Sequence, residues 1–255
     1  MTKLPEAFLK APIAHRALHD VENGRPENAP SSIRAAMEAG YGIEIDLQLS
    51  KDGVAMVFHD YDMERLTGVK GAVQTRTAAE LQQVKLLGSD ETIPTLEDVL
   101  ELVAGRVPLL IELKDQDGIM GANTGRLEKA TAAALQGYDG PVALMSFNPH
   151  SVRLMSGLLP DVPRGLTTSA FSADKWPLLP KGTRERLRRI PDYAANKCSF
   201  ISHEADDLGA ERVQDLKRRG AHILCWTIKS AAHEAEVRKV AENVTFEGYD
   251  AAIPA

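Results

Sequence analysis

Short apolar runs alternate with longer amphipathic segments along the whole chain, and this alternation limits the folds available to it. The apolar runs predict nine strands, at Pro12–His15, Ile43–Leu49, Val54–Phe58, Leu109–Leu113, Val142–Phe147, Gly165–Thr168, Phe200–His203, Ile223–Ile228 and Val244–Phe246. The segments between them predict helices at Ser31–Ala39, Leu96–Val103, Thr124–Leu135, Pro149–Leu158, Gly182–Ala195, Ala210–Arg219 and Ser230–Val240. Strands separated by helices are typical of parallel βαβ units. About eight such repeats predict an α/β fold closed into a (β/α)8 TIM barrel.

Nine strands are one more than a TIM barrel holds, and the run Val54–Phe58 is the one expected outside it. Only residues 50–53, with the turn-forming sequence SKDG, separate this run from the preceding strand, which favours a hairpin. Residues 61–94 are the least regular stretch, and they predict an insertion or lid. Because no linker-like stretch interrupts the alternation, the chain is expected to form one domain over residues 1–255.

Composition narrows the possible partners and location. The net charge of -6 argues against a nucleic-acid partner, because phosphate binding needs a clustered basic surface. No stretch approaches the roughly 18 apolar residues of a membrane-spanning helix, and the N-terminal segment lacks the apolar run of a signal peptide. Cys198 and Cys225 lie far apart and match no metal or redox spacing, as expected for buried thiols in a reducing compartment. The sequence therefore predicts a cytoplasmic protein, and it carries no indication of the oligomeric state.

Two carboxylates share one face of the second predicted strand. In the run Glu44-Ile45-Asp46, residues two apart point the same way, so both carboxylates project together while Ile45 faces the helices. Two unpaired carboxylates on an inward face repel each other and are costly to bury. A divalent cation resolves that conflict, and oxygen ligands suit magnesium or calcium. The alternative is a salt bridge from this pair to a neighbouring strand.

The strand Leu109–Leu113 repeats the arrangement. Glu112 and Lys114 lie on one face, with Ile111 and Leu113 on the other. Glu112 would complete a metal triad with the first two carboxylates, and the lysine beside it would hold a phosphate oxygen as a point charge. Taken alone, Glu112 and Lys114 also fit a structural ion pair.

Two histidines follow apolar strands at their C-terminal ends, where parallel barrels carry their active sites. His15 ends the first predicted strand and has Arg16 beside it, and His59 follows the run Val54–Phe58. One histidine would activate an attacking oxygen and the other would protonate a leaving alkoxide, while the guanidinium grips a phosphate. These parts suit phosphoryl transfer.

The order of these motifs resembles the glycerophosphodiester phosphodiesterase family. The matching positions span nearly the whole chain, and they are His15-Arg16, Pro26-Glu27-Asn28, Glu44-x-Asp46, Asp52-Gly53, His59-Asp60, Arg65-Leu66-Thr67-Gly68, Ile93-Pro94-Thr95-Leu96, Ile111-Glu112-Leu113-Lys114, Ser146-Phe147 and Trp226-Thr227. Each dipeptide alone is weak, but their common order at workable spacing makes the resemblance specific.

The resemblance implies a hydrolase on a TIM barrel of the phospholipase-C-like phosphodiesterase type, using one divalent metal ion. That ion would be Mg²⁺ or Ca²⁺, with Mn²⁺ also compatible. The family's catalytic positions fall on His15 and His59. Its metal-binding positions fall on Glu44, Asp46 and Glu112. Its substrate-binding positions fall on Arg16, Lys114, Phe147 and Trp226. Glu27 matches a family position close to the metal, which implies an outer ligand or a residue behind the ligands.

The sequence departs from the family pattern at two places. Ala17 stands where the family's first motif normally has glycine after His-Arg, so the turn is strained if that position needs a positive φ. The C-terminal strand region, residues 244–250, replaces the family's usual Gly-Val-Asp-Gly type of ending, and no convincing eighth helix follows it. A helix near Leu4–Leu9 is expected to cover the bottom of the barrel instead.

The leading prediction is therefore metal-dependent hydrolysis of a small-molecule glycerophosphodiester to sn-glycerol 3-phosphate and an alcohol, within lipid and glycerol metabolism. Water or the substrate's own 2-hydroxyl would serve as the nucleophile. One alternative is a phospholipase D-like relative acting on lysophospholipids; such relatives are secreted and carry a disulfide near the site, which neither cysteine here provides. The other alternative, suggested by Ala17, is a barrel that binds phosphoesters without catalysis.

Overall fold

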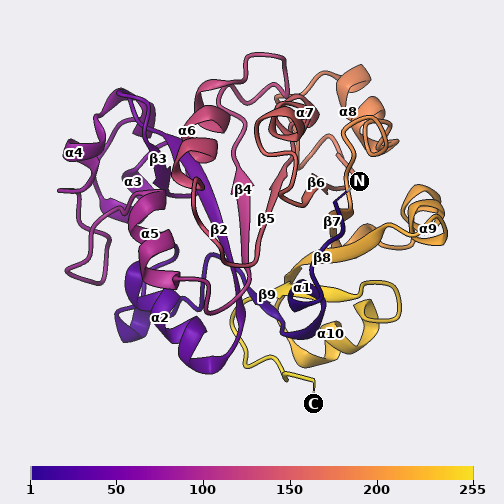
Figure 1. Cartoon of the computed structure of the whole chain (residues 1–255), viewed down its shortest axis with the longest axis horizontal. Helices are drawn as coiled ribbons and strands as arrows, with labels where there is room; N and C mark the ends of the chain where they lie inside the picture. Colours follow the sequence, from indigo (N-terminus) through magenta and orange to yellow (C-terminus); the bar gives the residue numbers. More distant parts are fainter. Residues whose placement is uncertain (1, 255) are drawn as a thin grey trace.

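All nine apolar runs form strands in the computed structural model, which describes residues 2–254. The strands are β1 (Ile13–Ala14), β2 (Gly42–Leu49), β3 (Ala55–Val57), β4 (Leu109–Leu113), β5 (Val142–Ser146), β6 (Arg164–Thr168), β7 (Phe200–Glu204), β8 (His222–Ile228) and β9 (Asn243–Phe246). Eight of them run parallel in the order β1-β9-β8-β7-β6-β5-β4-β2, and β1 also pairs with β2. The sheet is therefore closed, and the predicted TIM barrel is confirmed (Figure 1).

The strand β3 is the ninth strand and lies outside the barrel, as the SKDG turn predicts. It pairs with β2 in the antiparallel sense, with Leu47 opposite Val57 and Leu49 opposite Ala55. Gly53 in the turn has a φ of 92°, a backbone conformation that favours glycine. The hairpin runs back along β2 from its C-terminal end and brings His59 close to Asp46, whose carbonyl oxygen accepts a 2.9 Å hydrogen bond from Phe58 N.

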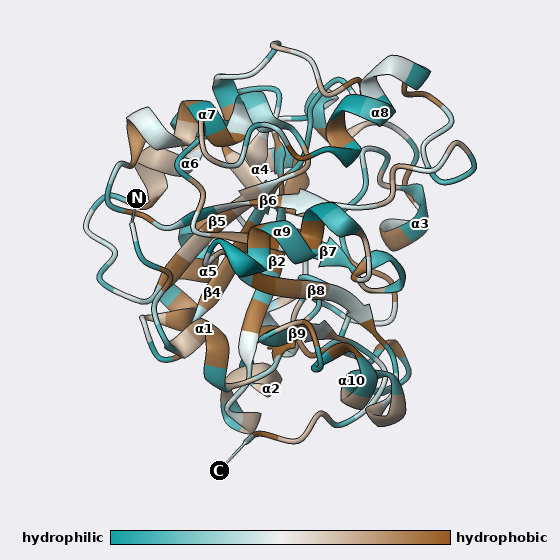
Figure 2. Ribbon diagram, turned by 90° about the vertical axis from the view of Figure 1, so that its right-hand side faces the viewer, coloured by the Kyte–Doolittle hydropathy of each residue, from teal (hydrophilic) through white to brown (hydrophobic). Residues whose placement is uncertain are grey.

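Helices surround the barrel (Figures 1 and 2). The α-helices are α1 (Ala7–Lys10), α2 (Pro30–Ala39), α3 (Glu64–Thr67), α4 (Ala78–Leu81), α5 (Leu96–Val103), α6 (Arg126–Ala134), α7 (Pro149–Leu158), α8 (Lys181–Arg188), α9 (Glu211–Arg218) and α10 (Ala231–Val237), and the short 3-10 helices are η1 (Val21–Asn23), η2 (Val73–Thr75) and η3 (Ala205–Asp207). In Figure 2 the strands are largely brown, whereas the helices carry both polar and apolar residues. Helices such as α2, α5 and α9 bury one apolar face against the barrel.

Alternation along the strands produces two apolar layers. Outward-facing residues such as Ile45 and Ile111 pack against the helices, while inward-facing residues such as Leu110 and Leu224 fill the lower part of the barrel. The inward positions nearer the C-terminal ends of the strands are polar or aromatic. The floor of the functional site therefore rests on a packed core.

The helix predicted at Gly182–Ala195 was too long, because α8 ends at Arg188. Pro191 explains the difference, since proline has no N–H to donate and disfavours helical backbone at the residue before it. Ile190, the preceding residue, has a φ of 45°, outside the right-handed helical region. The chain then forms turns up to β7.

The N-terminal segment closes the bottom of the barrel, as predicted for Leu4–Leu9. Leu4 and Phe8 are fully buried among the inward-facing side chains of the barrel. The Asn243 side chain at the start of β9 donates hydrogen bonds of 2.8 and 2.7 Å to the carbonyl oxygens of Phe8 and Ala11. After β9 the chain continues to residue 254 without another helix, in agreement with the sequence.

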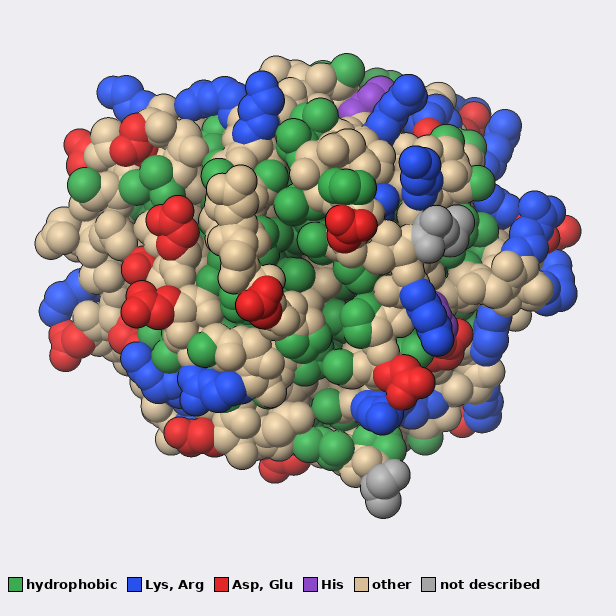
Figure 3. All heavy atoms as spheres, viewed as in Figure 1, with side chains coloured by type: hydrophobic (Ala, Val, Ile, Leu, Met, Phe, Trp, Pro, Cys, Tyr) green, Lys and Arg blue, Asp and Glu red, His purple; other side chains and the backbone are tan. Residues whose placement is uncertain are grey.

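Residues 61–94 hold only short helical pieces and have an apolar cluster of their own. Met63, Leu66 and Leu81 pack there against Met56 and Phe58 of the β3 hairpin. The segment is thus fixed beside the C-terminal end of β2 and carries Arg65 to the site. Acidic and basic side chains are interspersed over the face of the molecule seen in Figure 3. Over residues 2–254, no helix has both the length and the apolar character needed to cross a membrane.

Candidate active site

One cavity at the C-terminal end of the barrel brings together nine of the ten residues predicted for the site. Its volume is about 110 Å³. The predicted residues that line it are His15, Arg16, Glu44, Asp46, His59, Glu112, Lys114, Phe147 and Trp226. The tenth, Glu27, lies directly behind Arg16 and forms an ion pair with it. These residues come from β1, β2, β3, β4, β5, β8 and the segments that follow them, so only the closed barrel with its β3 hairpin assembles them.

Glu44, Asp46 and Glu112 form a compact cluster of buried carboxylates. Asp46 lies directly opposite Glu112 in the register of β2 and β4, and Glu44 is one pleat below on the same face. One oxygen from each residue lies within 4.8 Å of the others. Three buried oxygen donors at this spacing fit one divalent cation of the hard type.

The charges in this cluster are unequally compensated. Burial, then the negative charges of Asp46 and Glu112, raise the pKa of the Glu44 carboxyl well above its ordinary value. Burial also opposes ionisation of Asp46, but Lys114, His59 and Arg16 together outweigh it and hold the Asp46 pKa below its usual range. Within residues 2–254 Glu44 has no ion-pair partner, so it gains most from a bound cation.

Lys114 lies against the carboxylates. Its Nζ is 2.7 Å from Asp46 Oδ1 and 2.6 Å from Glu112 Oε1. Burial alone would lower the pKa of Lys114, but these two carboxylates raise it above its ordinary value, so the ammonium stays charged. The structural ion pair considered for Glu112 and Lys114 therefore exists, and the side chain also lines the cavity from which it would reach a phosphate oxygen.

Each histidine of the pair binds a carboxylate through Nδ1. His15 Nδ1 is 2.6 Å from Glu247 Oε2, and His59 Nδ1 is 2.6 Å from Asp60 Oδ1. The hydrogen bond to His15 helps hold the pKa of the Glu247 carboxyl far below its ordinary value. The hydrogen bond to His59 does the same for the pKa of the Asp60 carboxyl. Both acidic side chains therefore accept these hydrogen bonds as carboxylates. Nδ1 of each ring must then donate. Nε2 is left as the atom that exchanges a proton with a ligand.

Arg16 is held by two acidic partners. Its guanidinium forms an ion pair with Glu27, and its Nε lies 3.7 Å from Asp46 Oδ2. Glu27 in turn binds Arg65, whose Nε donates a 2.6 Å hydrogen bond to Asp60 Oδ2. These alternating charges link Asp60, the partner of His59, to Arg16, the residue after His15, and they fix the Arg16 side chain at the cavity wall.

Ala17 adopts a φ of 64°, so the position where the family has glycine does need left-handed backbone here. Its N–H donates to the Glu44 carbonyl over 3.0 Å, which ties the turn to β2. Left-handed backbone costs a non-glycine residue roughly 1–2 kcal/mol, while glycine loses about 0.5–1 kcal/mol of chain entropy.

We therefore expect Ala17→Gly to raise the free energy of unfolding by about 0.5–1 kcal/mol. Urea unfolding followed by circular dichroism measures this change. Ala134→Gly, within the last turn of α6, is the control and should destabilise the protein by a similar amount. A destabilising Ala17→Gly would mean that the buried methyl group contributes more than the backbone strain costs.

Aromatic side chains form another part of the cavity lining. The rings of Phe147 and Trp226 have centroids 5.6 Å apart at an interplanar angle of 84°, and Trp176 lies 4.9 Å from Phe147. Trp226 Nε1 donates a 3.0 Å hydrogen bond to the Ser202 carbonyl oxygen. Trp176, from the long loop after β6, and Tyr61 line a neighbouring cavity of about 720 Å³ that shares His59 and Lys114 with the first.

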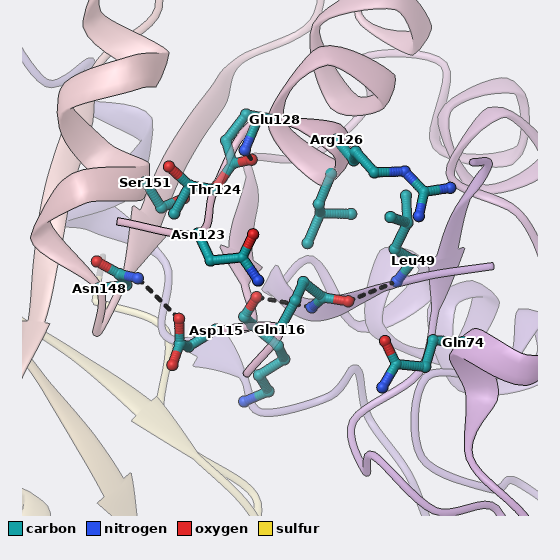
Figure 4. Close-up of a pocket in the computed structure, with 13 residues that line it drawn as sticks. Leu49, Gln74, Asp115, Gln116, Asn123, Thr124, Arg126, Glu128, Asn148 and Ser151 are labelled. Atoms are coloured by element: carbon teal, nitrogen blue, oxygen red, sulfur yellow. Dashed lines mark hydrogen bonds between the residues drawn. The ribbon is translucent and has the colours of Figure 1, made fainter. Parts of the chain in front are cut away.

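A third cavity, of about 170 Å³, is lined in part by the loop between β4 and α6, and Figure 4 shows Asp115, Gln116 and Asn148 at its edge. Gln116 Nε2 donates to the Lys114 carbonyl over 2.8 Å, and its Oε1 accepts from Leu49 N over 3.2 Å. Beside it, Asn148 donates a 2.7 Å hydrogen bond to Asp115. These contacts clamp the end of β4 to β2 and β5.

Sequence reasoning missed three residues that support the site. Glu247 binds His15, Asp60 binds His59, and Arg65 joins Asp60 to Glu27. His19, in the loop after β1, also lies near the pair of His15 and Glu247, with its Nε2 3.6 Å from Glu247 Oε2. Two of these three residues, Asp60 and Arg65, belong to the motifs that carry the family resemblance. That resemblance was the sequence signal available for them.

Comparison with known proteins agrees with this geometry. A model of the glycerophosphoryl diester phosphodiesterase family matches residues 15–245. A glycerophosphodiester phosphodiesterase from Caldanaerobacter subterraneus subsp. tengcongensis is 30% identical over 226 residues, which cover 85% of this chain and 84% of that protein.

Solved structures give the same result. An Oleispira antarctica phosphodiesterase, in complex with its product sn-glycerol-3-phosphate, is 26% identical with a TM-score of 0.76, and the match covers 94% of each chain. A glycerophosphodiester phosphodiesterase from Parabacteroides distasonis is 23% identical and shares the fold, with a TM-score of 0.73 over 93% of this chain and 92% of that one. The chain therefore belongs to the glycerophosphoryl diester phosphodiesterase family.

Proposed function

We propose that this protein hydrolyses glycerophosphodiesters to sn-glycerol 3-phosphate and an alcohol, as one phosphodiesterase domain over residues 1–255. One observation carries the proposal: a buried triad of carboxylates, two carboxylate-bound histidines and two fixed cations line the same cavity. A relative within the family is a glycerophosphodiester phosphodiesterase, and a structural neighbour binds sn-glycerol-3-phosphate. The intact set of acid–base and ligand residues favours catalysis over mere binding of a phosphoester.

The residues divide the chemistry between them. Arg16 and Lys114 bind and orient the phosphate, Arg16 by its planar fork and Lys114 as a point charge. His15 and His59 form the acid–base pair, because each has Nδ1 fixed by a carboxylate and Nε2 free to hold or release a proton. One takes the proton of the attacking oxygen, and the other gives a proton to the oxygen of the departing alcohol. Phe147 and Trp226 exclude water from the organic part of the substrate.

Glu44, Asp46 and Glu112 would hold one divalent cation, Mg²⁺ or Ca²⁺, with Mn²⁺ also suited to oxygen ligands. When bound, such an ion neutralises phosphate charge and lowers the pKa of a hydroxyl group that contacts it. Glu27, behind Arg16, acts through that arginine rather than on the substrate. We also propose a cytoplasmic location, supported by the two buried, unpaired thiols of Cys198 and Cys225.

The test is a panel of glycerophosphodiesters assayed first with EDTA and then with added Mg²⁺, Ca²⁺ or Mn²⁺. We expect release of glycerol 3-phosphate that needs the metal, followed with a coupled dehydrogenase assay. Lysophospholipid micelles form the second arm, because they are the substrate of the phospholipase D-like alternative. Activity that persists in EDTA would contradict the metal role, and turnover of lysolipids alone would contradict the substrate class.

Glu247→Gln is expected to lower kcat/KM by roughly 10²-fold or more. The glutamine amide oxygen can still accept a hydrogen bond from His15 Nδ1. The substitution nevertheless removes the negative charge that stabilises the protonated His15 ring. Burial lowers the pKa of His15, and the hydrogen bond and charge of Glu247 partly oppose this. Without that charge the His15 pKa falls further, so the corresponding limb of the pH–rate profile should move to lower pH.

The matched control is Glu242→Gln. Glu242 binds His222 in the same way, but this pair lies at the N-terminal end of β8, on the opposite side of the barrel from the site. Its replacement should leave both kcat/KM and the pH profile unchanged. A Glu247→Gln variant with normal kcat/KM and an unmoved pH limb would show that Glu247 has no part in positioning His15.

A further inference from the structure

Three buried hydroxyl groups face the interior of the barrel, and none has a hydrogen-bond partner among the described residues. They are Thr167 Oγ1 on β6, Ser202 Oγ on β7 and Thr245 Oγ1 on β9. All three residues are at most 2% exposed. Buried polar atoms are normally paired, since an unpaired one carries its full desolvation cost. Each of these hydroxyls therefore calls for an explanation.

Strand alternation fixes the direction in which these side chains point. The residues on either side of them along the strands, such as Leu166, Ile201 and Val244, pack outward against the helices. Thr167, Ser202 and Thr245 must then point inward. Thr167 and Ser202 are opposite each other in the register of β6 and β7.

Only two of the three hydroxyl residues reach the catalytic cavity. Thr167 and Thr245 line it together with His15 and Trp226, whereas Ser202 does not line it. A hydroxyl on the cavity wall with no protein partner is available to a ligand. The Ser202 hydroxyl has the same burial and the same lack of a partner, but no access to that ligand.

Thr167 and Thr245 lie on other strands than the carboxylate triad. The triad and Lys114 come from β2 and β4, whereas Thr167 lies on β6 and Thr245 lies on β9, the neighbour of β1. A phosphate bound by Arg16 and Lys114 leaves the rest of the ligand facing neutral hydroxyl groups and Trp226. Neutral hydroxyl groups pair best with the alcohol groups of a polyol, which both donate and accept.

We propose that the Thr167 and Thr245 hydroxyls hydrogen-bond the free hydroxyl groups of the glycerol portion, and so determine specificity for a glycerol phosphate over a simple alkyl phosphate. This inference rests on the proposed function of the same site. It assigns the two threonines a role in recognition rather than in proton transfer. The loss of either hydroxyl should then weaken the binding only of ligands that carry the alcohol groups.

The test is calorimetric binding of two ligands that differ only in those alcohol groups, glycerol 3-phosphate and propyl phosphate, with saturating Mg²⁺. We expect Thr167→Val and Thr245→Val each to raise the Kd of glycerol 3-phosphate about tenfold, the usual worth of one hydrogen bond. The Kd of propyl phosphate should not change. Because valine keeps the shape of threonine and no protein hydrogen bond is lost, the Tm of each variant should not fall.

Ser202→Ala is the matched control and should alter neither Kd, since Ser202 has the same unpaired hydroxyl outside the cavity. Thr167→Ser and Thr245→Ser retain the hydroxyl and should restore the preference for glycerol 3-phosphate if a valine variant folds poorly. Equal effects on both ligands, or none on either, would overturn the inference. Because binding is measured without turnover, a wild-type protein that fails to hydrolyse glycerophosphodiesters would contradict the proposed function alone.

Discussion

His15→Ala and His59→Ala are each expected to lower kcat for glycerophosphodiesters by about 10²–10⁴-fold. The reason is geometric: both rings line the catalytic cavity, and each has Nδ1 bound to a carboxylate, so only Nε2 can serve the reaction. An alanine removes the proton acceptor or donor and leaves the phosphate-binding residues in place. KM should therefore change much less than kcat.

The double variant should be little slower than either single variant, because acid and base act in one proton-transfer sequence. Steady-state rates with saturating metal measure all three. His150→Ala serves as the control, since His150 is exposed at the start of α7 and should retain full activity. Near-wild-type turnover in both single variants would contradict the assignment of the histidines.

Much of the fold could be predicted from the sequence, because one physical pattern repeats along it. Each barrel strand is an apolar run between amphipathic segments, and the alternation within β2 and β4 places Glu44, Asp46 and Glu112 on one inward face. The four-residue SKDG turn likewise explains why β3 forms a hairpin with β2 outside the barrel. These are local properties, and local properties are readable from a single chain.

Helix ends were less predictable. The run that forms α8 keeps a helical pattern past Arg188, and only Pro191 interrupts it. A proline acts on the residue before it through a steric clash, so its effect is a boundary rather than a change of pattern. Pro191 therefore predicts that the helix ends before Ile190, as it does.

The partners of the histidines were beyond sequence reasoning for a different reason. His15 and Glu247 are 232 residues apart and meet only because β1 pairs with β9 when the barrel closes. The segment after β9 also departs from the family's usual ending, so the resemblance gave Glu247 no role. Lys114 was placed correctly on the face of Glu112, but its simultaneous contact with Asp46 depends on the exact register of β2 and β4.

Glu44→Gln is expected to have opposite effects on metal binding and on stability. The residue is 2% exposed and its oxygens lie close to those of Asp46 and Glu112, so three like charges share one buried site. Lys114 compensates the charges of Asp46 and Glu112. Burial, together with the negative charges of those two carboxylates, raises the pKa of Glu44. A carboxyl whose folded-state pKa is raised destabilises the fold above its unfolded pKa, because it must ionise in an unfavourable place.

Glutamine has nearly the shape of glutamate without its charge, so in EDTA at neutral pH the variant should unfold at the wild-type Tm or above it. In contrast, loss of an anionic ligand should raise the metal Kd at least about 100-fold. Titration calorimetry with Mg²⁺, Ca²⁺ and Mn²⁺ measures the second effect. Glu204→Gln, a buried carboxylate at the end of β7 outside the triad, should leave the metal Kd unchanged. An unchanged metal Kd in Glu44→Gln would contradict the triad, whereas a lower Tm would show that the charge already has a compensating partner.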